Sequence, residues 1–324
     1  MSNTVIRWGI IGTGAMASQF ADELLMHSDA SLSAVASSCA NRADAFAKKK
    51  GCFDSHNYEQ LLDRQDIDAI YIASTNDKHF ELAMNCIERE KPCLVEKPIC
   101  TSLSDLDTLI TTVRKKGVFC MEAMWMLFFP AIINLKRSLE VIGPIENIDV
   151  SFCIDVPYKP NHRLYSPALG GGALFDIGIY PLTFVRYLLG LEVDKMECNL
   201  SFAPTGTDDE GTIVLTYKQD VTAHLYYSLK TAKPHRAVIT GQYGTVTIED
   251  FFHPSSMTHV LKSGEVKTYR YCYASMGYNY EIDEVHRALK NSAKESDIMP
   301  LSTSYEILSF MLTILSKSHQ KILL

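Results

Sequence analysis

The sequence has no surplus of basic residues. Its 31 lysines and arginines are outnumbered by 38 aspartates and glutamates, which gives a formal net charge of -7. Proteins that bind nucleic acids or anionic membranes usually carry a basic stripe or patch. The charge balance therefore argues against a nucleic-acid or membrane partner.

The sequence also lacks the cysteine spacing of a metal or disulfide site. Its nine cysteines are scattered, their number is odd, and none forms a C-x-x-C pair. Reduced cysteines of this kind are typical of the cytoplasm, which is the location we expect. Arg7 and Trp8 interrupt any signal peptide, and no apolar run reaches the roughly 18 residues of a membrane span. We expect no metal site.

The chain is long enough for two domains. It has 324 residues, of which 47% are hydrophobic and 21% charged, as in ordinary globular proteins. We predict a dinucleotide-binding domain over residues 1–122. Residues 123–324 are predicted to form a domain for substrate binding and dimerisation.

The first domain alternates short apolar runs with helical patterns. Strands are predicted over residues 5–11, 31–37, 69–73, 92–95 and 118–121. Helices are predicted between them, over residues 15–26, 42–50, 58–63, 78–90 and 102–116. This alternation indicates an α/β fold of the Rossmann type, a doubly wound parallel sheet. Ligands of such sheets bind outside the carboxyl ends of the strands.

The pattern changes after residue 122. Strands are predicted over residues 148–154, 196–202, 211–217, 221–229, 237–240 and 245–248. Helices are predicted over residues 129–140, 175–189, 281–291 and 302–318. Several strands alternate apolar and polar residues, which indicates an α+β domain with an open, mostly antiparallel sheet. Because an open sheet face needs a cover, we expect a homodimer or a higher homo-oligomer.

A glycine turn follows the first predicted strand. It reads Gly12-Thr13-Gly14-Ala15-Met16-Ala17, which is the pattern G-x-G-x-x-A. Gly12 allows a tight turn, Gly14 lets the backbone approach a pyrophosphate, and Ala17 keeps the helix close to the strand. The helix start offers free N–H groups to phosphate. Its place between a strand and a helix makes this a predicted dinucleotide site.

The end of the second predicted strand favours NADP over NAD. An acidic residue there would bind the ribose hydroxyls of NAD, but the chain has Ser37-Ser38-Cys39-Ala40-Asn41-Arg42. The two serine hydroxyls, Asn41 and Arg42 suit a 2′-phosphate, because guanidinium groups bind phosphate well. The alternative is that Arg42 is a solvated residue at the start of a helix.

A lysine follows the fourth predicted strand, in Glu96-Lys97-Pro98. Lys97 lies at the edge of the sheet where ligands bind, and Pro98 forces an extended or cis backbone before it. The alternative is a solvated lysine at a strand end.

A glycine-rich segment precedes the second domain's main helix. After Gly170-Gly171-Gly172, Asp176 and Tyr180 are four residues apart and share a helix face. A carboxylate and a phenol on one face are candidates for proton transfer. The alternative is an aspartate that favours the helix dipole and a tyrosine packed in the core.

These segments, with Ala73-Ser74-Thr75-Asn76, resemble the family of glucose–fructose oxidoreductase and inositol dehydrogenase over nearly the whole chain. The resemblance implies that Lys97 and Tyr180 are catalytic and that Asp176 supports them. It also implies that the cofactor site is lined by Ser74, Thr75, Asn76, His79, Glu96, Lys97, Glu122 and Trp125.

Three further segments resemble one branch of this family, whose members are dimeric NADP-dependent dehydrogenases. They are 121–130, 176–180 and 205–209, with Tyr180 where many relatives carry histidine. Related sequences often carry arginine at the position of Leu127, so a polar substrate contact is expected to be missing.

The predicted activity is hydride transfer between NADP and a secondary alcohol or hemiacetal carbon of a small sugar, polyol or dihydrodiol. Tyr180 would exchange a proton with the substrate oxygen, and the ammonium of Lys97 would lower the pKa of that tyrosine. One alternative keeps the fold but acts on an inositol, a 1,5-anhydro sugar or a linear imine-type compound. Another is a non-catalytic dinucleotide-binding sensor, which would not need Lys97, Asp176 and Tyr180.

Overall fold

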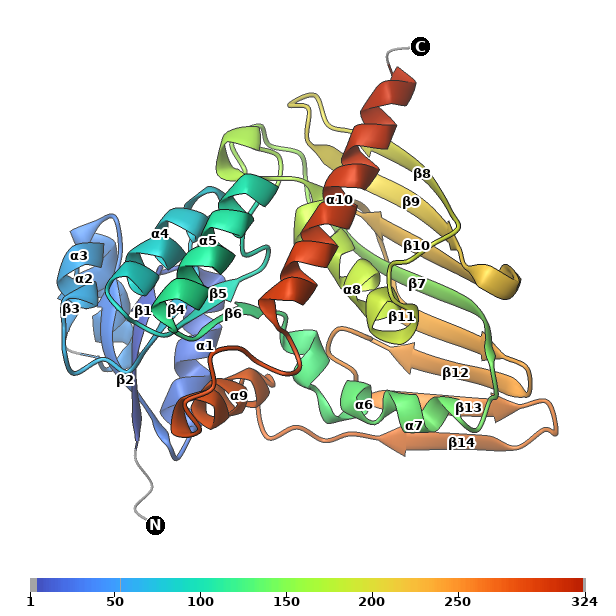
Figure 1. The fold of residues 1–324 in the computed structure, drawn as a ribbon, viewed down its shortest axis with the longest axis horizontal. Helices are drawn as coiled ribbons and strands as arrows, with labels where there is room; N and C mark the ends of the chain where they lie inside the picture. The colour runs from blue at the N-terminus through green and yellow to red at the C-terminus, as the bar shows by residue number, and fades with distance from the viewer. Residues whose placement is uncertain (1–4, 53, 323–324) are drawn as a thin grey trace. The chain divides into compact units, whose positions relative to one another are not determined.

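The computed structural model describes residues 5–52 and 54–322, which fold into two compact units (Figure 1). The first unit contains Met1–Trp125 and Tyr273–Tyr305, and the second contains Met126–Cys272 and Glu306–Leu324.

The first unit is built on a six-stranded parallel sheet with the order β3-β2-β1-β4-β5-β6. Its strands are β1 (Ile6–Ile11), β2 (Ala30–Ala36), β3 (Ser55–His56), β4 (Ala69–Ile72), β5 (Cys93–Glu96) and β6 (Cys120–Ala123). The inner strands β4, β5 and β6 are buried at every residue, as expected when helices cover both faces. The strand order changes direction between β1 and β4, where Rossmann folds bind dinucleotides.

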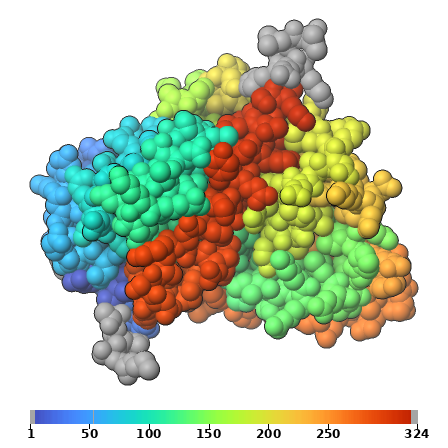
Figure 2. All heavy atoms as spheres, viewed as in Figure 1, coloured from blue at the N-terminus to red at the C-terminus, as the bar shows by residue number. Residues whose placement is uncertain are grey.

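Five helices connect these strands. They are α1 (Ala15–Met26), α2 (Ala40–Lys50), α3 (Tyr58–Leu62), α4 (Asn76–Glu88) and α5 (Leu103–Lys116). Connections from β1 and from β4 run in opposite directions, so right-handed crossovers place α1 and α2 on one face and α4 and α5 on the other. The helices α4 and α5 contact each other and form part of the surface of this unit (Figure 2).

The segment Tyr273–Tyr305, which includes helix α9 (Asn279–Lys290), packs with the first unit. This differs from the predicted division at residue 122, which gave the segment to the second domain. Buried polar contacts are the reason. The carboxylate of Glu23 on α1 accepts hydrogen bonds from the Met276 amide at 2.8 Å and the Ser275 hydroxyl at 2.6 Å.

A second buried contact fixes α9. The indole of Trp8 on β1 donates to Nε2 of His286 at 3.0 Å. Because an indole can only donate, Nε2 must be unprotonated. Burial lowers the pKa of His286 to about 4, which keeps the ring neutral.

The second unit is built on an eight-stranded sheet with the order β14-β13-β12-β11-β7-β10-β9-β8. The strands are β7 (Ile145–Asp155), β8 (Lys195–Phe202), β9 (Asp208–Thr216), β10 (Thr222–Ser228), β11 (Lys230–Gly241), β12 (Gly244–Glu249), β13 (Ser256–Leu261) and β14 (Val266–Arg270). Only the pair β7–β10 is parallel. The predicted open, mostly antiparallel sheet is confirmed, and β13 and β14 were missed.

Helical segments accompany this sheet. They are α6 (Pro130–Ile133), α7 (Leu135–Leu139), η2 (Pro167–Leu169), the π-helical turn η3 (Leu174–Gly178), α8 (Ile179–Leu189), η4 (Lys218–Asp220) and α10 (Leu301–Ile322). The 3-10 turn η1 (Trp125–Phe128) precedes them. Helix α8 packs on β7 and β10, and Ile314 and Ser318 of α10 contact Cys198 on β8. The helix predicted over residues 175–189 therefore starts as a π turn.

The two faces of this sheet differ in burial. One row crosses seven strands, and every residue in it is buried: Cys198, Ile213, Leu225, Val150, Ala237, Ile248 and Met257. The adjacent row, on the opposite face, contains no buried residue. Its members are Glu197, Val214, His224, Asp149, Val238, Thr247, Thr258 and Thr268. We call the face that carries the second row the open face.

One helical segment, Pro167–Leu189, is long and apolar enough to cross a membrane by length and composition. This corrects the expectation that no run reaches such a length. However, 78% of its most apolar window is buried inside the protein. That degree of burial is what a core helix shows.

Candidate active site

The glycine turn lies between β1 and α1, at the carboxyl end of the central strand. Gly12 has φ +120°, and a Cβ there would lie 2.1 Å from the carbonyl oxygen of Ala73. Gly14 caps α1 and is exposed, with no atom within 4 Å of the position of an added Cβ. Thr13, Ala15 and Met16 are partly or fully exposed at the helix start. The turn therefore presents open backbone to a ligand.

The end of β2 places two polar groups together. Nη2 of Arg42 donates to Oγ of Ser38 at 3.0 Å, and both residues are exposed. Ser37 is buried, and its hydroxyl accepts from the Cys39 amide at 3.3 Å. Asn41 is exposed in the first turn of α2. A guanidinium, a hydroxyl and a helix start suit an anionic group.

The loop that carries Lys97 is held at three successive residues. The Lys97 amide donates to Oε2 of Glu96 at 3.3 Å. The Pro98 carbonyl lies 2.8 Å from Nδ1 of His79, and the Ile99 amide donates to Oε1 of Glu122 at 2.9 Å. The Lys97-Pro98 bond is cis, one of the two backbone forms predicted there. These contacts fix the backbone that carries the lysine.

His79 is a buried support, with 1% of its surface exposed. Burial lowers the pKa of its ring, so the imidazole is neutral and carries one N–H. That N–H donates from Nδ1 to Pro98, because the contact from Nε2 to the Ser74 carbonyl is longer at 3.3 Å. The side chain therefore holds the loop of Lys97.

Glu96 and Glu122 are also buried. The hydroxyl of Tyr71 on β4 donates to Oε1 of Glu96. Burial, followed by the charge of Glu96, raises the pKa of Tyr71, so it stays protonated and able to donate. Burial likewise raises the pKa of Glu122. Tyr71, Glu96 and Glu122 thus belong to the three neighbouring strands β4, β5 and β6.

The remaining predicted cofactor residues lie near the start of α4 and after β6. Ser74, Thr75 and Asn76 are half-buried, and Thr75 caps α4. The ring of Trp125 stacks on Tyr278 with 4.9 Å between ring centroids. The Tyr278 hydroxyl donates to Oε1 of Gln19 at 3.0 Å, so Trp125 is linked to α1. Tyr278 was not predicted.

In the second unit, Asp176 lies in the π turn η3. Its Oδ1 accepts from Nη1 of Arg163 at 2.9 Å. The Asp176 side chain is 12% exposed and that of Arg163 is 49% exposed, so the pair reaches the surface through the arginine. π turns are rare and frequently mark functional sites.

Tyr180 lies in the first turn of α8 and is 8% exposed. Its ring centroid lies 5.3 Å from that of Phe152 and 6.0 Å from that of Phe252. His235 contacts the same two phenylalanines. Leu127, where relatives often carry arginine, is 2% exposed and belongs to the core.

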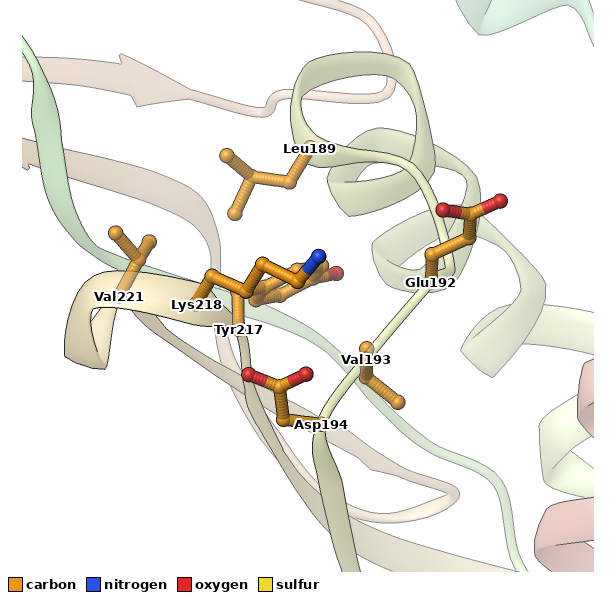
Figure 3. Close-up of a pocket in the computed structure, with 7 residues that line it drawn as sticks. All are labelled: Leu189, Glu192, Val193, Asp194, Tyr217, Lys218 and Val221. Atoms are coloured by element: carbon orange, nitrogen blue, oxygen red, sulfur yellow. The ribbon is translucent and has the colours of Figure 1, made fainter.

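The second unit also contains a surface hollow of 490 Å³ (Figure 3). It is lined by Leu189, Glu192, Val193, Asp194, Tyr217, Lys218 and Val221. The Tyr217 hydroxyl is already used, because it donates to the Gly190 carbonyl at 2.9 Å. The hollow contains none of the predicted site residues.

The structure thus gathers the predicted cofactor residues at the carboxyl edge of one sheet, in the first unit. Lys97 belongs to that unit, and Asp176 and Tyr180 belong to the second. Among the residues that the structure describes, no group of three or more His, Cys, Asp or Glu could hold a metal ion.

Comparisons with known proteins agree with this arrangement. Residues 6–124 match an oxidoreductase family with an NAD-binding Rossmann fold, and residues 137–247 match the GFO/IDH/MocA C-terminal domain. The trans-1,2-dihydrobenzene-1,2-diol dehydrogenase of Mus musculus is 30% identical over 92% of both chains. The chain belongs to the Gfo/Idh/MocA family of oxidoreductases. This confirms the predicted family and supports an enzyme over a non-catalytic sensor.

A further curated relative and two solved structures also match over most of the chain. The scyllo-inositol 2-dehydrogenase (NADP(+)) of Bacillus subtilis is 29% identical over 90% of this chain and 91% of its own. A 3-ketoreductase from Actinomadura kijaniata, solved with NADP and TDP-benzene, has a TM-score of 0.86 and 24% identity, and covers 97% of this chain and 98% of its own. Levoglucosan dehydrogenase, solved with NADH and levoglucosan, has a TM-score of 0.86 and 18% identity, and 98% of each chain is covered. The predicted fold class is confirmed, and the chain is an NAD(P)-dependent oxidoreductase.

Proposed function

We propose that the protein transfers a hydride between NADP and a secondary alcohol or hemiacetal carbon of a small sugar, polyol or dihydrodiol. The observation that carries the proposal is the fixation of the Lys97 loop by three buried side chains, His79, Glu96 and Glu122. Burying three polar groups around one loop costs free energy. We take this cost as a sign that the lysine must be held in one place.

The residues of the first unit fit a dinucleotide. Gly14 leaves room for a pyrophosphate beside the start of α1, and an added Cβ at this position would occupy that room. The pair of Ser38 and Arg42 would hold the 2′-phosphate of NADP. When bound, the nicotinamide supplies the hydride acceptor or donor. The Bacillus subtilis relative is named for NADP(+), which supports the same choice here.

The proton chemistry is assigned to Lys97, Tyr180 and Asp176. During oxidation the phenolate of Tyr180 accepts the proton of the substrate hydroxyl. During reduction the Tyr180 hydroxyl donates that proton to the substrate oxygen. The ammonium of Lys97 hydrogen-bonds the substrate oxygen and favours the phenolate. Asp176, held by Arg163, orients the helix face that carries Tyr180. Each step moves one proton at a named oxygen.

The names of two relatives and the surroundings of Tyr180 support the proposed substrate class. Relatives are named for a dihydrodiol and for scyllo-inositol, both of which carry secondary alcohols. Phe252, which is half-buried beside Tyr180, offers apolar surface to a ring with an apolar face.

A substrate screen tests the proposal. The protein is incubated with NADP or NAD and with a trans-dihydrodiol, an inositol, levoglucosan or a pentose, and the absorbance of the reduced nicotinamide is followed. We expect turnover with at least one of these alcohols, and faster turnover with NADP. Cofactor binding without turnover on any of them would favour the sensor instead.

We further propose a homodimer or higher homo-oligomer formed through the open face, in the cytoplasm. Val214 and Val238 lie within that face and are half-exposed, which favours a protein cover. Light scattering at micromolar concentration measures the mass. We expect at least twice the mass of the chain, and Val238→Lys is expected to reduce it. A monomeric mass for the unmodified protein contradicts the proposal.

A further inference from the structure

Asp208 opens strand β9 and is 3% exposed. Its Oδ2 accepts the backbone amide of Leu174 at 2.7 Å. Leu174 is the first residue of the π turn η3, which carries Asp176. The residue before the turn, Ala173, has no side chain that can cap it. The first N–H groups of a helical turn need acceptors from elsewhere, and Asp208 supplies one from 34 positions along the chain.

The glycine segment makes room for this carboxylate. Gly172 has φ +137°, and a Cβ at this position would lie 2.6 Å from Oδ1 of Asp208. Any other residue would push the carboxylate away from the Leu174 amide. The Asp176 amide in turn donates to the Gly172 carbonyl at 3.1 Å. One carboxylate and one glycine therefore set the start of the turn.

Tyr227 on β10 supports the other end of the turn. A Cβ at Gly178, the last residue of η3, would lie 3.0 Å from the ring of Tyr227. The ring also packs against Gly211 on β9, where an added Cβ would lie 2.4 Å from it. The buried π turn is thus held by Asp208 at its start and by an aromatic ring at its end.

We propose that Asp208 is a positioning residue for the reaction, which fixes the π turn that presents Asp176 and leads into Tyr180. The inference rests on the proposed function for the roles of those two residues. Asp208 is 3% exposed and is bonded to the backbone of the turn, so we assign it no direct contact with substrate or cofactor. It acts through the hydrogen bond to Leu174, so an acceptor atom at the same place is what the site requires.

Four variants test this inference. Asp208→Ala removes the acceptor, and Asp208→Asn keeps a carbonyl oxygen in its place. Asp208→Glu displaces the acceptor but keeps the charge, and serves if the alanine variant does not fold. Asp209→Ala is the matched control, because Asp209 is the buried neighbour on the same strand. Its own carboxylate is bound by Ser201 at 2.5 Å and by Lys230 at 3.3 Å, away from the turn.

For Asp208→Ala we expect kcat to fall on the order of 10- to 100-fold, because small misplacements of reacting groups cost that much. KM for NADP should stay within about twofold, since the substitution leaves the predicted cofactor-binding residues unchanged. Asp208→Asn should keep kcat within about threefold of the unmodified protein, because the acceptor remains. Hydrogen exchange of the peptide 172–180 should quicken about tenfold in Asp208→Ala and in Asp208→Glu, and should stay unchanged in Asp208→Asn and Asp209→Ala.

Wild-type kcat and unchanged exchange in Asp208→Ala overturn the inference. Equal losses of kcat and of cofactor affinity in Asp208→Ala and Asp209→Ala also overturn it, because they indicate general damage to the strand. Tyr180→Phe separates this inference from the proposed function. If that variant keeps full turnover, the assigned role of Tyr180 fails, whereas the exchange measurement still decides whether Asp208 holds the turn.

Discussion

Two single-methyl substitutions in the glycine turn separate cofactor binding from folding. The first is Gly14→Ala. Gly14 has φ -81° and ψ -171°, which alanine adopts freely, and no atom lies within 4 Å of the new Cβ. Alanine is a poorer helix cap than glycine but restricts the unfolded chain, and these effects of about 0.5–1 kcal/mol each largely cancel. The melting temperature should stay within a few degrees of wild type.

Cofactor affinity should respond differently. The added methyl group occupies the space that the pyrophosphate needs beside the start of α1. Overpacking of this kind costs about 1–3 kcal/mol. The Kd for NADPH should therefore rise about 10- to 100-fold.

The second substitution is Gly12→Ala, which should damage the fold itself. Its Cβ would lie 2.1 Å from the carbonyl oxygen of Ala73, a backbone atom that no side-chain rotation can move away. The φ of +120° adds about 1–3 kcal/mol of strain, and the forced separation of β1 from β4 adds about 1–3 kcal/mol. The expected loss of about 2–6 kcal/mol is a large part of a typical domain's stability.

Thermal unfolding and a fluorescence titration with NADPH measure both variants. Unchanged NADPH affinity in a folded Gly14→Ala protein would refute the turn as the pyrophosphate site. Unchanged stability in Gly12→Ala would refute the close backbone contact with Ala73.

Two further predictions concern the first unit. Arg42→Ala should weaken NADP binding about tenfold and leave NAD binding unchanged, which titration with both cofactors measures; an equal loss for both argues against a 2′-phosphate contact. For His286, the pKa of about 4 lies below the usual histidine value of 6.5, so the unfolded state binds a proton that the folded state excludes. Stability therefore falls as pH drops from 6.5 towards 4. Urea unfolding at pH 7 and pH 4.5 should show a loss on the order of 2–3 kcal/mol that is absent in His286→Gln, and equal pH dependence of both proteins contradicts this.

The alternation of strands and helices predicted the first unit well, because its buried parallel strands are short apolar runs. The second sheet was predicted less completely. Strands β13 and β14 were missed, since the edge strand Val266–Arg270 is exposed at four of its five residues and has no apolar run. The π turn η3 was missed as well, because its sequence fits an α-helix equally.

The sequence also located only part of the candidate site. The motifs located Lys97, Asp176 and Tyr180, and the resemblance placed His79 and Glu122 at the cofactor. The structure shows these last two bonded to the backbone of the Lys97 loop, which no spacing in the sequence indicates. For Tyr71, the available signal was a phenol within the apolar strand 69–72. For Asp208, it was a pair of acids at residues 208–209 before an apolar run.

The central claim is that Lys97 and Tyr180 perform the proton chemistry of an NADP-dependent dehydrogenase. Turnover and NADPH affinity are measured for Lys97→Met, Tyr180→Phe and the unmodified protein, with an alcohol that the screen identifies. We predict that both variants lose turnover by at least about 100-fold, the scale of general acid–base catalysis, while their affinity for NADPH stays nearly the same. Turnover at the wild-type rate in both variants contradicts it.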